Sequence, residues 1–348
     1  MKPRLFFSPI LALLLTTCAP GQPMPQGGGN ALRETPNATV PRAVPEEGNA
    51  AGSLSVAGGA LSYRQVLMHR IELQEAAIRK AESAGMVDGR LAWIYEQLGL
   101  LYANVAMWDK SEASLEHAIS LFRHSPKEND ELATALSSLG RVHVSLGKLR
   151  ESEKEEEEAL RLRQAKGDPL MIARSKDDLA ELYLAQRKLA KAKDAARQAI
   201  DEFAGDVGAD AFDKVSARYS LALALCASKD CPSAVAPLKE AIEEAKSSFE
   251  MRDFSLGIGE FLLGYAYWKS GDVVSAGTYM ERGTNLMNDQ LGWGHPMYLA
   301  ALKHYARFLR ESGRKEDAEE VERRIRRAEV VVDVRSFGTG SPSITGLR

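Results

Sequence analysis

Residues 98–102 read Leu98-Gly99-Leu100-Leu101-Tyr102, and their arrangement returns five more times along the chain. Each copy has a small residue directly after a large one, and Tyr, His or Leu three positions after the small residue. Successive copies lie 40 to 42 residues apart, and a fixed period of that length indicates a repeat array. The small residues of the six copies form a first column: Gly99, Gly140, Ala180, Ala222, Gly264 and Ala306.

Two further columns of small residues keep the same period. The second column is Ser111, Ser152, Ala192, Ala234, Ala276 and Ala318. The third is Ala118, Ala159, Ala199, Ala241 and Gly283, with Ile325 at the last position. Residues three and four positions apart share one face of a helix, and small side chains let two helices approach closely. Gly147, Gly271 and Gly313 mark turns, so the pattern predicts pairs of helices.

This layout resembles the tetratricopeptide repeat, and its long period resembles the version found in kinesin light chains. The segment Leu291-Gly292-Trp293-Gly294-His295-Pro296 is also similar to that subgroup, in which His-Pro opens the first helix of a pair. The resemblance implies an all-α fold, a right-handed superhelical solenoid of helix–turn–helix repeats. We expect six repeats over residues 91–328, a degenerate capping half-repeat at 61–90, and an extended or disordered tail at 329–348.

The N-terminus has the layout of an export signal. Two basic residues precede a short apolar run that ends in Leu15-Thr16-Thr17-Cys18. This resembles the signal peptide and lipobox of bacterial lipoproteins, which implies removal of residues 1–17 and a lipid on Cys18. The alternative is an ordinary secretory signal cut a few residues further on. An uncleaved anchor does not fit, because residues 5–15 are too few to span a bilayer.

Residues 18–60 are rich in Pro, Gly and Ala and contain hardly any large apolar side chain. Such a segment cannot bury enough surface to offset its ordering entropy, so we predict a disordered tether. Ala19 follows the modified cysteine, and in the enterobacterial lipoproteins that it resembles the absence of Asp there implies outer-membrane export. We therefore expect an exported protein on the periplasmic face of the outer membrane, attached to the membrane through the lipid only.

Composition and motifs argue against catalysis. The chain is 45% hydrophobic and 27% charged with a formal charge of −3, and no basic face suggests nucleic acid. The six histidines lack metal-ligand spacing, and neither a nucleophile motif nor a phosphate loop occurs. We expect no enzyme activity, no metal and no cofactor. His143 occupies a core column, so we interpret it as a packing residue.

Cys226 and Cys231 flank a predicted turn between two helices. Once Cys18 is lipidated they are the remaining pair of thiols, and such a pair tends to be oxidised in an exported protein. The alternative is that they are two small apolar core residues.

An acidic run, Glu151, Glu153 and Glu155 to Glu158, falls on the second helix of a pair. Such helices line the convex side of this architecture. We therefore expect a solvated face, with a protein-docking patch as the alternative.

The candidate binding site is the concave face, which the first helix of each pair lines. By analogy with the family, its exposed positions end in an aromatic and then basic group, namely Phe261, Tyr265, Trp268, Lys303, Arg307 and Arg310. This group could hold an extended peptide with an acidic end. The alternative is that several of the aromatic residues are packed in the core. Earlier positions on the same face include Trp93, Glu96, Leu100, Asn104, Arg141, Asp177, Glu181 and Tyr219.

These features favour a membrane-anchored scaffold that binds a protein or peptide partner of the cell envelope in the groove. One alternative is a module that binds peptidoglycan or exported polysaccharide through aromatic residues on the groove floor. Another is a regulatory subunit of an envelope complex.

Overall fold

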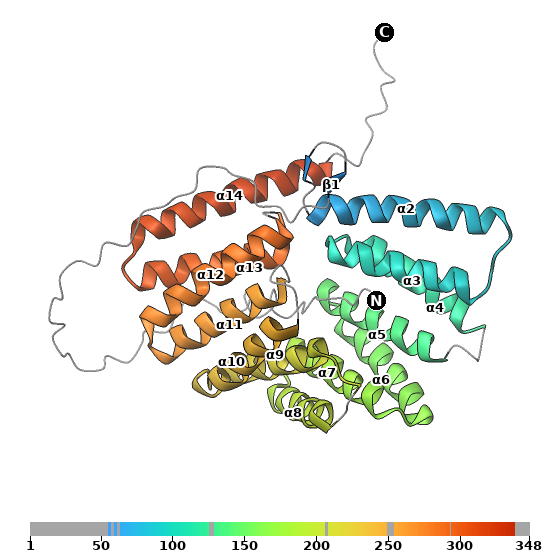
Figure 1. The fold of residues 1–348 in the computed structure, drawn as a ribbon, viewed down its shortest axis with the longest axis horizontal. Coiled ribbons are helices and arrows are strands. Elements are labelled where there is room, and N and C mark those ends of the chain that lie inside the picture. The colour runs from blue at the N-terminus through green and yellow to red at the C-terminus, as the bar shows by residue number, and fades with distance from the viewer. Residues whose placement is uncertain are drawn as a thin grey trace, which may run out of the picture.

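The computed structural model describes residues 55–56, 59–60, 63–124, 129–205, 208–248, 254–292 and 294–337. Within these ranges the chain forms thirteen α-helices, one short 3-10 helix and one small β-hairpin (Figure 1). The predicted signal peptide, Cys18 and most of the predicted tether lie outside the described residues. None of the described helices combines the length and the apolar character that a membrane span requires.

Six consecutive helix pairs follow the leading helix α2 (Tyr63–Ser83). They are α3 (Gly89–Asn104) with α4 (Trp108–Phe122), α5 (Asn129–Leu146) with α6 (Leu149–Lys166), α7 (Pro169–Ala185) with α8 (Leu189–Gly205), α9 (Ala211–Ala227) with η2 (Pro232–Ala234) and α10 (Val235–Ser248), α11 (Phe254–Ser270) with α12 (Val273–Leu291), and α13 (Pro296–Glu311) with α14 (Lys315–Phe337). Each pair packs on the next, which confirms the predicted all-α solenoid of helix–turn–helix repeats.

The pairs follow a curved path that brings the two ends of the array to the same side of the molecule (Figure 1). Helix α2 packs along α3 and also contacts α12 of the fifth pair. The first helices of successive pairs also contact one another, α3 with α5, α5 with α7, α7 with α9, and α9 with α11. Such close spacing is expected on the inside of a curved stack, and in Figure 1 α5 and α7 lie inside α6 and α8.

The small-residue columns are the places where paired helices touch. Every member of the second column is fully buried. A Cβ added at Gly99 would lie 2.7 Å from Leu115 Cγ, and one at Gly264 would lie 2.6 Å from Met280 Cγ. A larger residue would therefore push the two helices apart, and this close contact explains the small residues that mark the repeat.

One turn geometry recurs in every pair. Gly147, Gly271 and Gly313 have φ angles of 75°, 89° and 84°, in the left-handed region that ends a helix. The other three pairs reach the same region without glycine, at Ala106, Arg187 and Lys229, with φ angles of 60°, 61° and 65°. All six pairs therefore turn through a residue with left-handed backbone angles, but this residue is glycine in only three of them.

The His-Pro start of α13 has the expected local structure. His295 has an extended backbone, and its Nδ1 accepts a hydrogen bond from the Met297 backbone N–H at 3.2 Å. Pro296 occupies the first helical turn, where no backbone donor is needed. His295 therefore caps the start of the helix, where the resemblance to the kinesin-light-chain repeat placed the His-Pro pair.

Two predicted boundaries differ from the structure. Helix α14 extends to Phe337, so the β-branched run of residues 330–334 is helical although we placed it in the tail. β-Branched residues weaken a helix only slightly, and α14 is packed along α13. Within the predicted tether, β1 (Ser55–Val56) pairs antiparallel with β2 (Gly59–Ala60).

Candidate binding face

Three positions recur on each first helix with the period of the array, and thirteen of these eighteen residues are buried. We call them the inner positions. They are Glu96, Gln97 and Leu100 on α3; Ser137, Ser138 and Arg141 on α5; Asp177, Asp178 and Glu181 on α7; Tyr219, Ser220 and Leu223 on α9; Phe261, Leu262 and Tyr265 on α11; and Lys303, His304 and Arg307 on α13. The chemistry changes in steps, since α7 is acidic, α11 is apolar and α13 is basic.

The acidic helix α7 is tied into its surroundings by hydrogen bonds. Asp177 accepts hydrogen bonds from the hydroxyls of Ser216 and Ser220 on α9, at 2.6 Å and 2.8 Å. Burial nevertheless raises the pKa of the Asp177 carboxyl to about 6. Asp178 lies between two guanidinium groups, 3.7 Å from Arg141 and 3.7 Å from Arg163.

Glu156 on α6 lies beside this group in the interior. It is 1% exposed, and its Oε2 accepts a hydrogen bond from the Ser137 hydroxyl at 3.1 Å. Burial and the charge of Asp178 raise the pKa of Glu156 well above its ordinary value. Gly140 makes room for the carboxylate, because a Cβ there would lie 2.7 Å from Glu156 Oε1.

These side chains lie where the second helix pair meets the third, with Asp177 also bonded to α9 of the fourth pair, and we call them the polar junction. Its four carboxyl groups outnumber its two guanidinium groups. Arg163 also donates a hydrogen bond to the Ser175 hydroxyl at 2.6 Å, so both cations are held by fixed partners. The members are Arg141, Glu156, Arg163, Asp177, Asp178 and Glu181.

The structure brings together only part of the predicted aromatic and basic group. Tyr265 packs edge-on against Trp268 with ring centroids 5.7 Å apart, and Arg307 lies over Trp268 at 5.9 Å. Trp268 is 8% exposed and packs on Phe308 of α13. Phe261 is fully buried in the main hydrophobic cluster. Most of this aromatic surface is therefore packing between the fifth and sixth pairs.

Two of the predicted cations contact α14 instead of a groove. Arg310 donates two hydrogen bonds to Glu322, at 2.7 Å and 2.8 Å, and Lys303 forms an ion pair with Glu329 at 2.8 Å. Both carboxylates belong to the helix that ends the array. Arg310 and Lys303 therefore neutralise the exposed end of the solenoid, and Arg307 is the predicted cation that reaches the aromatic residues.

The acidic run on α6 is only partly the solvated face that the sequence suggested, because Glu151 and Glu157 are exposed but the other four glutamates contact neighbouring residues. Glu153 pairs with Lys188 at 3.1 Å, and Glu158 pairs with Arg123 at 2.8 Å. Glu155 lies 2.7 Å from His143 Nδ1. A run of like charges on one helix can thus pair with cationic side chains on several neighbouring helices. The sequence alone does not show which cations face the run.

His143 lies between two carboxylates, with Nδ1 near Glu155 and Nε2 2.8 Å from Glu112 of α4. Burial alone would lower its pKa, but the two carboxylates raise the pKa above the ordinary value. His143 is buried, as we interpreted it from the sequence, and it also joins α4, α5 and α6 through its two carboxylate partners. The described residues contain no group of three or more His, Cys, Asp or Glu side chains that could hold a metal ion.

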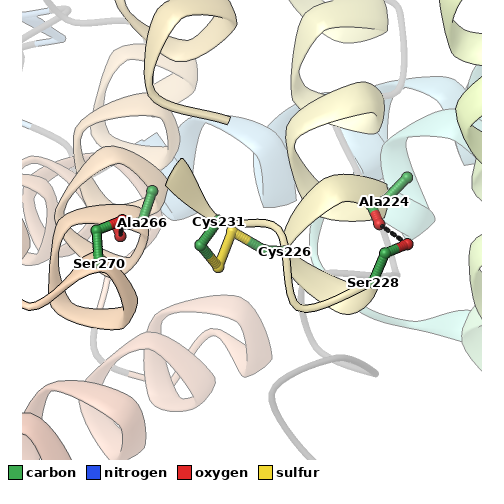
Figure 2. Close-up of a disulfide and its surroundings, with 6 residues drawn as sticks. All are labelled: Ala224, Cys226, Ser228, Cys231, Ala266 and Ser270. Carbon is green, nitrogen blue, oxygen red and sulfur yellow. Dashed lines mark hydrogen bonds between the residues drawn. A yellow bond between two sulfur atoms is a disulfide. The ribbon is translucent and has the colours of Figure 1, made fainter. Parts of the chain in front are cut away.

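A disulfide joins Cys226 at the end of α9 to Cys231 just before η2 (Figure 2). Cys231 is buried, with 3% exposure. At the equivalent position the second helix of each other pair has already begun, for example at Leu189 and Val273. In the fourth pair the second helix instead starts with the 3-10 turn after Cys231, so the cross-link coincides with the irregular turn.

Comparison with known proteins identifies the repeat. The family model described as Tetratricopeptide repeat matches residues 90–165, which cover α3 to α6. The fold is a tetratricopeptide solenoid. Proteins built from this repeat are generally non-catalytic scaffolds. No curated protein matches the sequence.

Solved structures share the architecture at low identity. A Rap protein complexed with Competence and Sporulation Factor is 16% identical, with 78% of this chain and 86% of that chain covered and a TM-score of 0.55. BtubC (BKLC) from P. vanneervenii is 19% identical, with 71% and 95% covered and a TM-score of 0.51. A putative kinesin light chain with nearly identical repeats from Podosopora anserina is 19% identical, with 59% and 98% covered and a TM-score of 0.48. At these identities the likeness shows the fold alone.

Proposed function

We propose that this protein is a non-catalytic scaffold that binds a protein or peptide partner on the inner face of its solenoid. The observation that carries the proposal is the change of chemistry among the inner positions that are not buried, from Asp178 on α7 through Tyr265 on α11 to Lys303 and Arg307 on α13. An extended polypeptide can present a cation, an apolar side chain and a carboxylate in that order. A Rap protein of the same fold is complexed with Competence and Sporulation Factor, which supports partner binding as a class.

The alternative of a glycan-binding module has less support. Sugar rings would need aromatic faces on the groove floor, but Phe261 is fully buried and Trp268 packs against Phe308. The observations therefore favour a polypeptide ligand.

Site-specific photo-crosslinking tests the binding face. A photoreactive amino acid replaces Tyr265 at an inner position, or Glu157, an exposed residue of α6, as the matched control. We expect one discrete crosslinked protein from Tyr265 in intact cells and none from Glu157, and Arg307→Glu should weaken the Tyr265 product. Equal labelling from both positions, or no product from Tyr265, would contradict the proposal.

We also propose that the scaffold is held at the membrane by a lipid on Cys18, on the periplasmic face of the outer membrane. The support is the lipobox-like run that ends at Cys18 and the composition of the segment that follows. In cells fed with labelled palmitate, Cys18→Ser should abolish the lipid label and move the protein from the membrane fraction to the soluble fraction. Persistent label in the variant would refute the anchor.

A further inference from the structure

Two core columns of the second helices carry an exception in the second repeat. The Leu115 column is Leu115, Glu156, Ala196, Leu238, Met280 and Glu322. The Phe122 column is Phe122, Arg163, Phe203, Ala245, Met287 and Glu329. In the first, third, fourth and fifth repeats both positions are apolar. In the sixth repeat both are glutamates at the end of the array, paired with cations of α13.

In the second repeat, by contrast, both positions are ionisable and lie in the interior, and Arg163 pairs with Asp178 of α7. Glu156 is 1% exposed and Arg163 is 4% exposed, as little as the apolar residues of the same columns. Within the described part of the chain, no hydrogen bond reaches Glu156 Oε1. A buried charge without full hydrogen bonding is costly, and a buried ion pair is seldom as favourable as apolar residues of the same size.

The neighbouring junctions are apolar at these two column positions, and the junction of the third and fourth repeats also carries the Arg174–Asp213 ion pair. Phe122 lies at the junction of the first and second repeats and is 1% exposed. Phe203 lies at the junction of the third and fourth repeats, in a cluster with Ala173, Ala199, Ala209 and Ala217. Opening either junction would expose a phenylalanine to water. Opening the polar junction would instead hydrate carboxylates and guanidinium groups, which offsets part of the lost contact.

We propose that the polar junction is the hinge of the solenoid, at which α2 to α6 move as one body relative to α7 to α14. The motion would separate α6 from α7 and release the contact between α2 and α12, which closes the arc from the other side. It would also change the spacing between the inner positions of α5 and those of α7. The inference does not depend on whether a partner binds there.

Protonation should control this hinge. Raising the pH from 5 to 8 ionises Asp177, whose pKa burial raises to about 6, and adds negative charge next to Asp178. Repulsion among the carboxylates then favours the open form. The groups that face Asp177 and Glu156 are Ser137 and Arg141 on α5, Arg163 on α6, Asp178 on α7, and Ser216 and Ser220 on α9. Around them, Glu181 acts on Arg141, and Arg174, which is paired with Asp213, acts on Asp178.

Hydrogen exchange of the full chain, corrected for intrinsic rates, tests the hinge. At pH 8 we expect amides of α6 and α7 to exchange about tenfold faster than those of α4 and α5, as local opening at a weak junction predicts. The Glu156→Leu/Arg163→Phe variant carries the residues of the first repeat and should remove that difference. Glu157→Leu, an exposed change on the same helix, should leave it unchanged.

Comparing hydrogen exchange at pH 5 and pH 8 tests the hinge even if the double variant does not fold. In the wild type the excess exchange of α6 and α7 should shrink at pH 5, and Asp177→Asn should reduce its dependence on pH. Exchange of α6 and α7 at pH 8 that is no faster than that of α4 and α5 would overturn the hinge, and so would an excess that does not change with pH.

Discussion

The ionisation of one buried carboxyl, that of Asp177, makes the stability of the protein depend on pH. Its ordinary pKa is 3.8, and burial raises the pKa to about 6 in the folded protein despite two serine hydrogen bonds. Below pH 4 both the folded and the unfolded chain hold the proton. Between pH 4 and 6 only the folded chain holds it, so stability is lost as pH rises through this window.

Asp177→Asn should therefore stabilise the protein at high pH relative to low pH. The amide can accept one serine hydrogen bond and donate another, and it never ionises. Relative to wild type, we expect a gain of about 2 kcal/mol in the free energy of unfolding at pH 8 compared with pH 4, from the size of the pKa shift. Urea denaturation at the two pH values measures it, with the exposed Asp201→Asn as control. A pH-independent effect would contradict the assignment.

At the scale of elements, the turn inside each pair decides how the two helices meet. The left-handed residue is glycine in three pairs and Ala106, Arg187 or Lys229 in the others. A residue with a Cβ is strained there, whereas glycine is not. The three glycine turns could be recognised from sequence, but the other three could not, because Ala, Arg and Lys carry no turn signal.

Replacing the strained residue should stabilise the fold. Arg187 is exposed, so Arg187→Gly mainly relieves backbone strain, and we expect a gain of about 1 kcal/mol. Arg187→Ala is the matched control, because it removes the side chain but keeps the Cβ, and it should be near neutral. Thermal unfolding of the two variants measures the difference. An equal effect in both would show that the side chain matters and the backbone angle does not.

The disulfide acts within one turn. The bridged residues are five apart in sequence, so the chain-entropy gain is that of a short loop, about 2 kcal/mol. We expect the Cys226→Ala/Cys231→Ala variant to lose about this much stability under oxidising conditions. In the presence of a reductant, the wild type and the variant should unfold at nearly the same temperature. A wild type that is insensitive to reductant would contradict a stabilising bridge.

At the scale of the whole molecule, the 40- to 42-residue period predicted the six helix pairs. It did so because close contact between paired helices requires small residues at the same positions in every repeat. It was not enough for the polar junction. Glu156 and Arg163 occupy core columns that are apolar in four of the other repeats, and their partners on α5 and α7 come from distant segments. The aromatic residues were expected in the groove, but a helical face alone does not show that Trp268 packs on the next pair.

The last repeat carries glutamates at the same two column positions, where, within the described residues, the helix has no further pair to pack against. Glu322 and Glu329 keep the last helix polar where a seventh pair would otherwise pack. Glu322→Leu/Glu329→Phe should expose an apolar end and cause concentration-dependent self-association, visible by light scattering coupled to size-exclusion chromatography. Glu316→Leu/Glu319→Phe, on exposed positions of the same helix, should remain as the wild type. A monomeric end variant would contradict the capping role.

The contact between α2 and α12 also affects how this array unfolds. In an open solenoid each repeat touches only its neighbours, so an end can fray while the middle stays folded. Here α2, the first helix of the array, also contacts α12 of the fifth pair. Among the described helices, the N-terminal end is therefore held by a long-range contact, whereas α14 at the other end is held by its neighbours. Fraying from the N-terminal side must break that long-range contact first. The first pairs should therefore resist proteases until the molecule opens as a unit, and digestion should begin at α14.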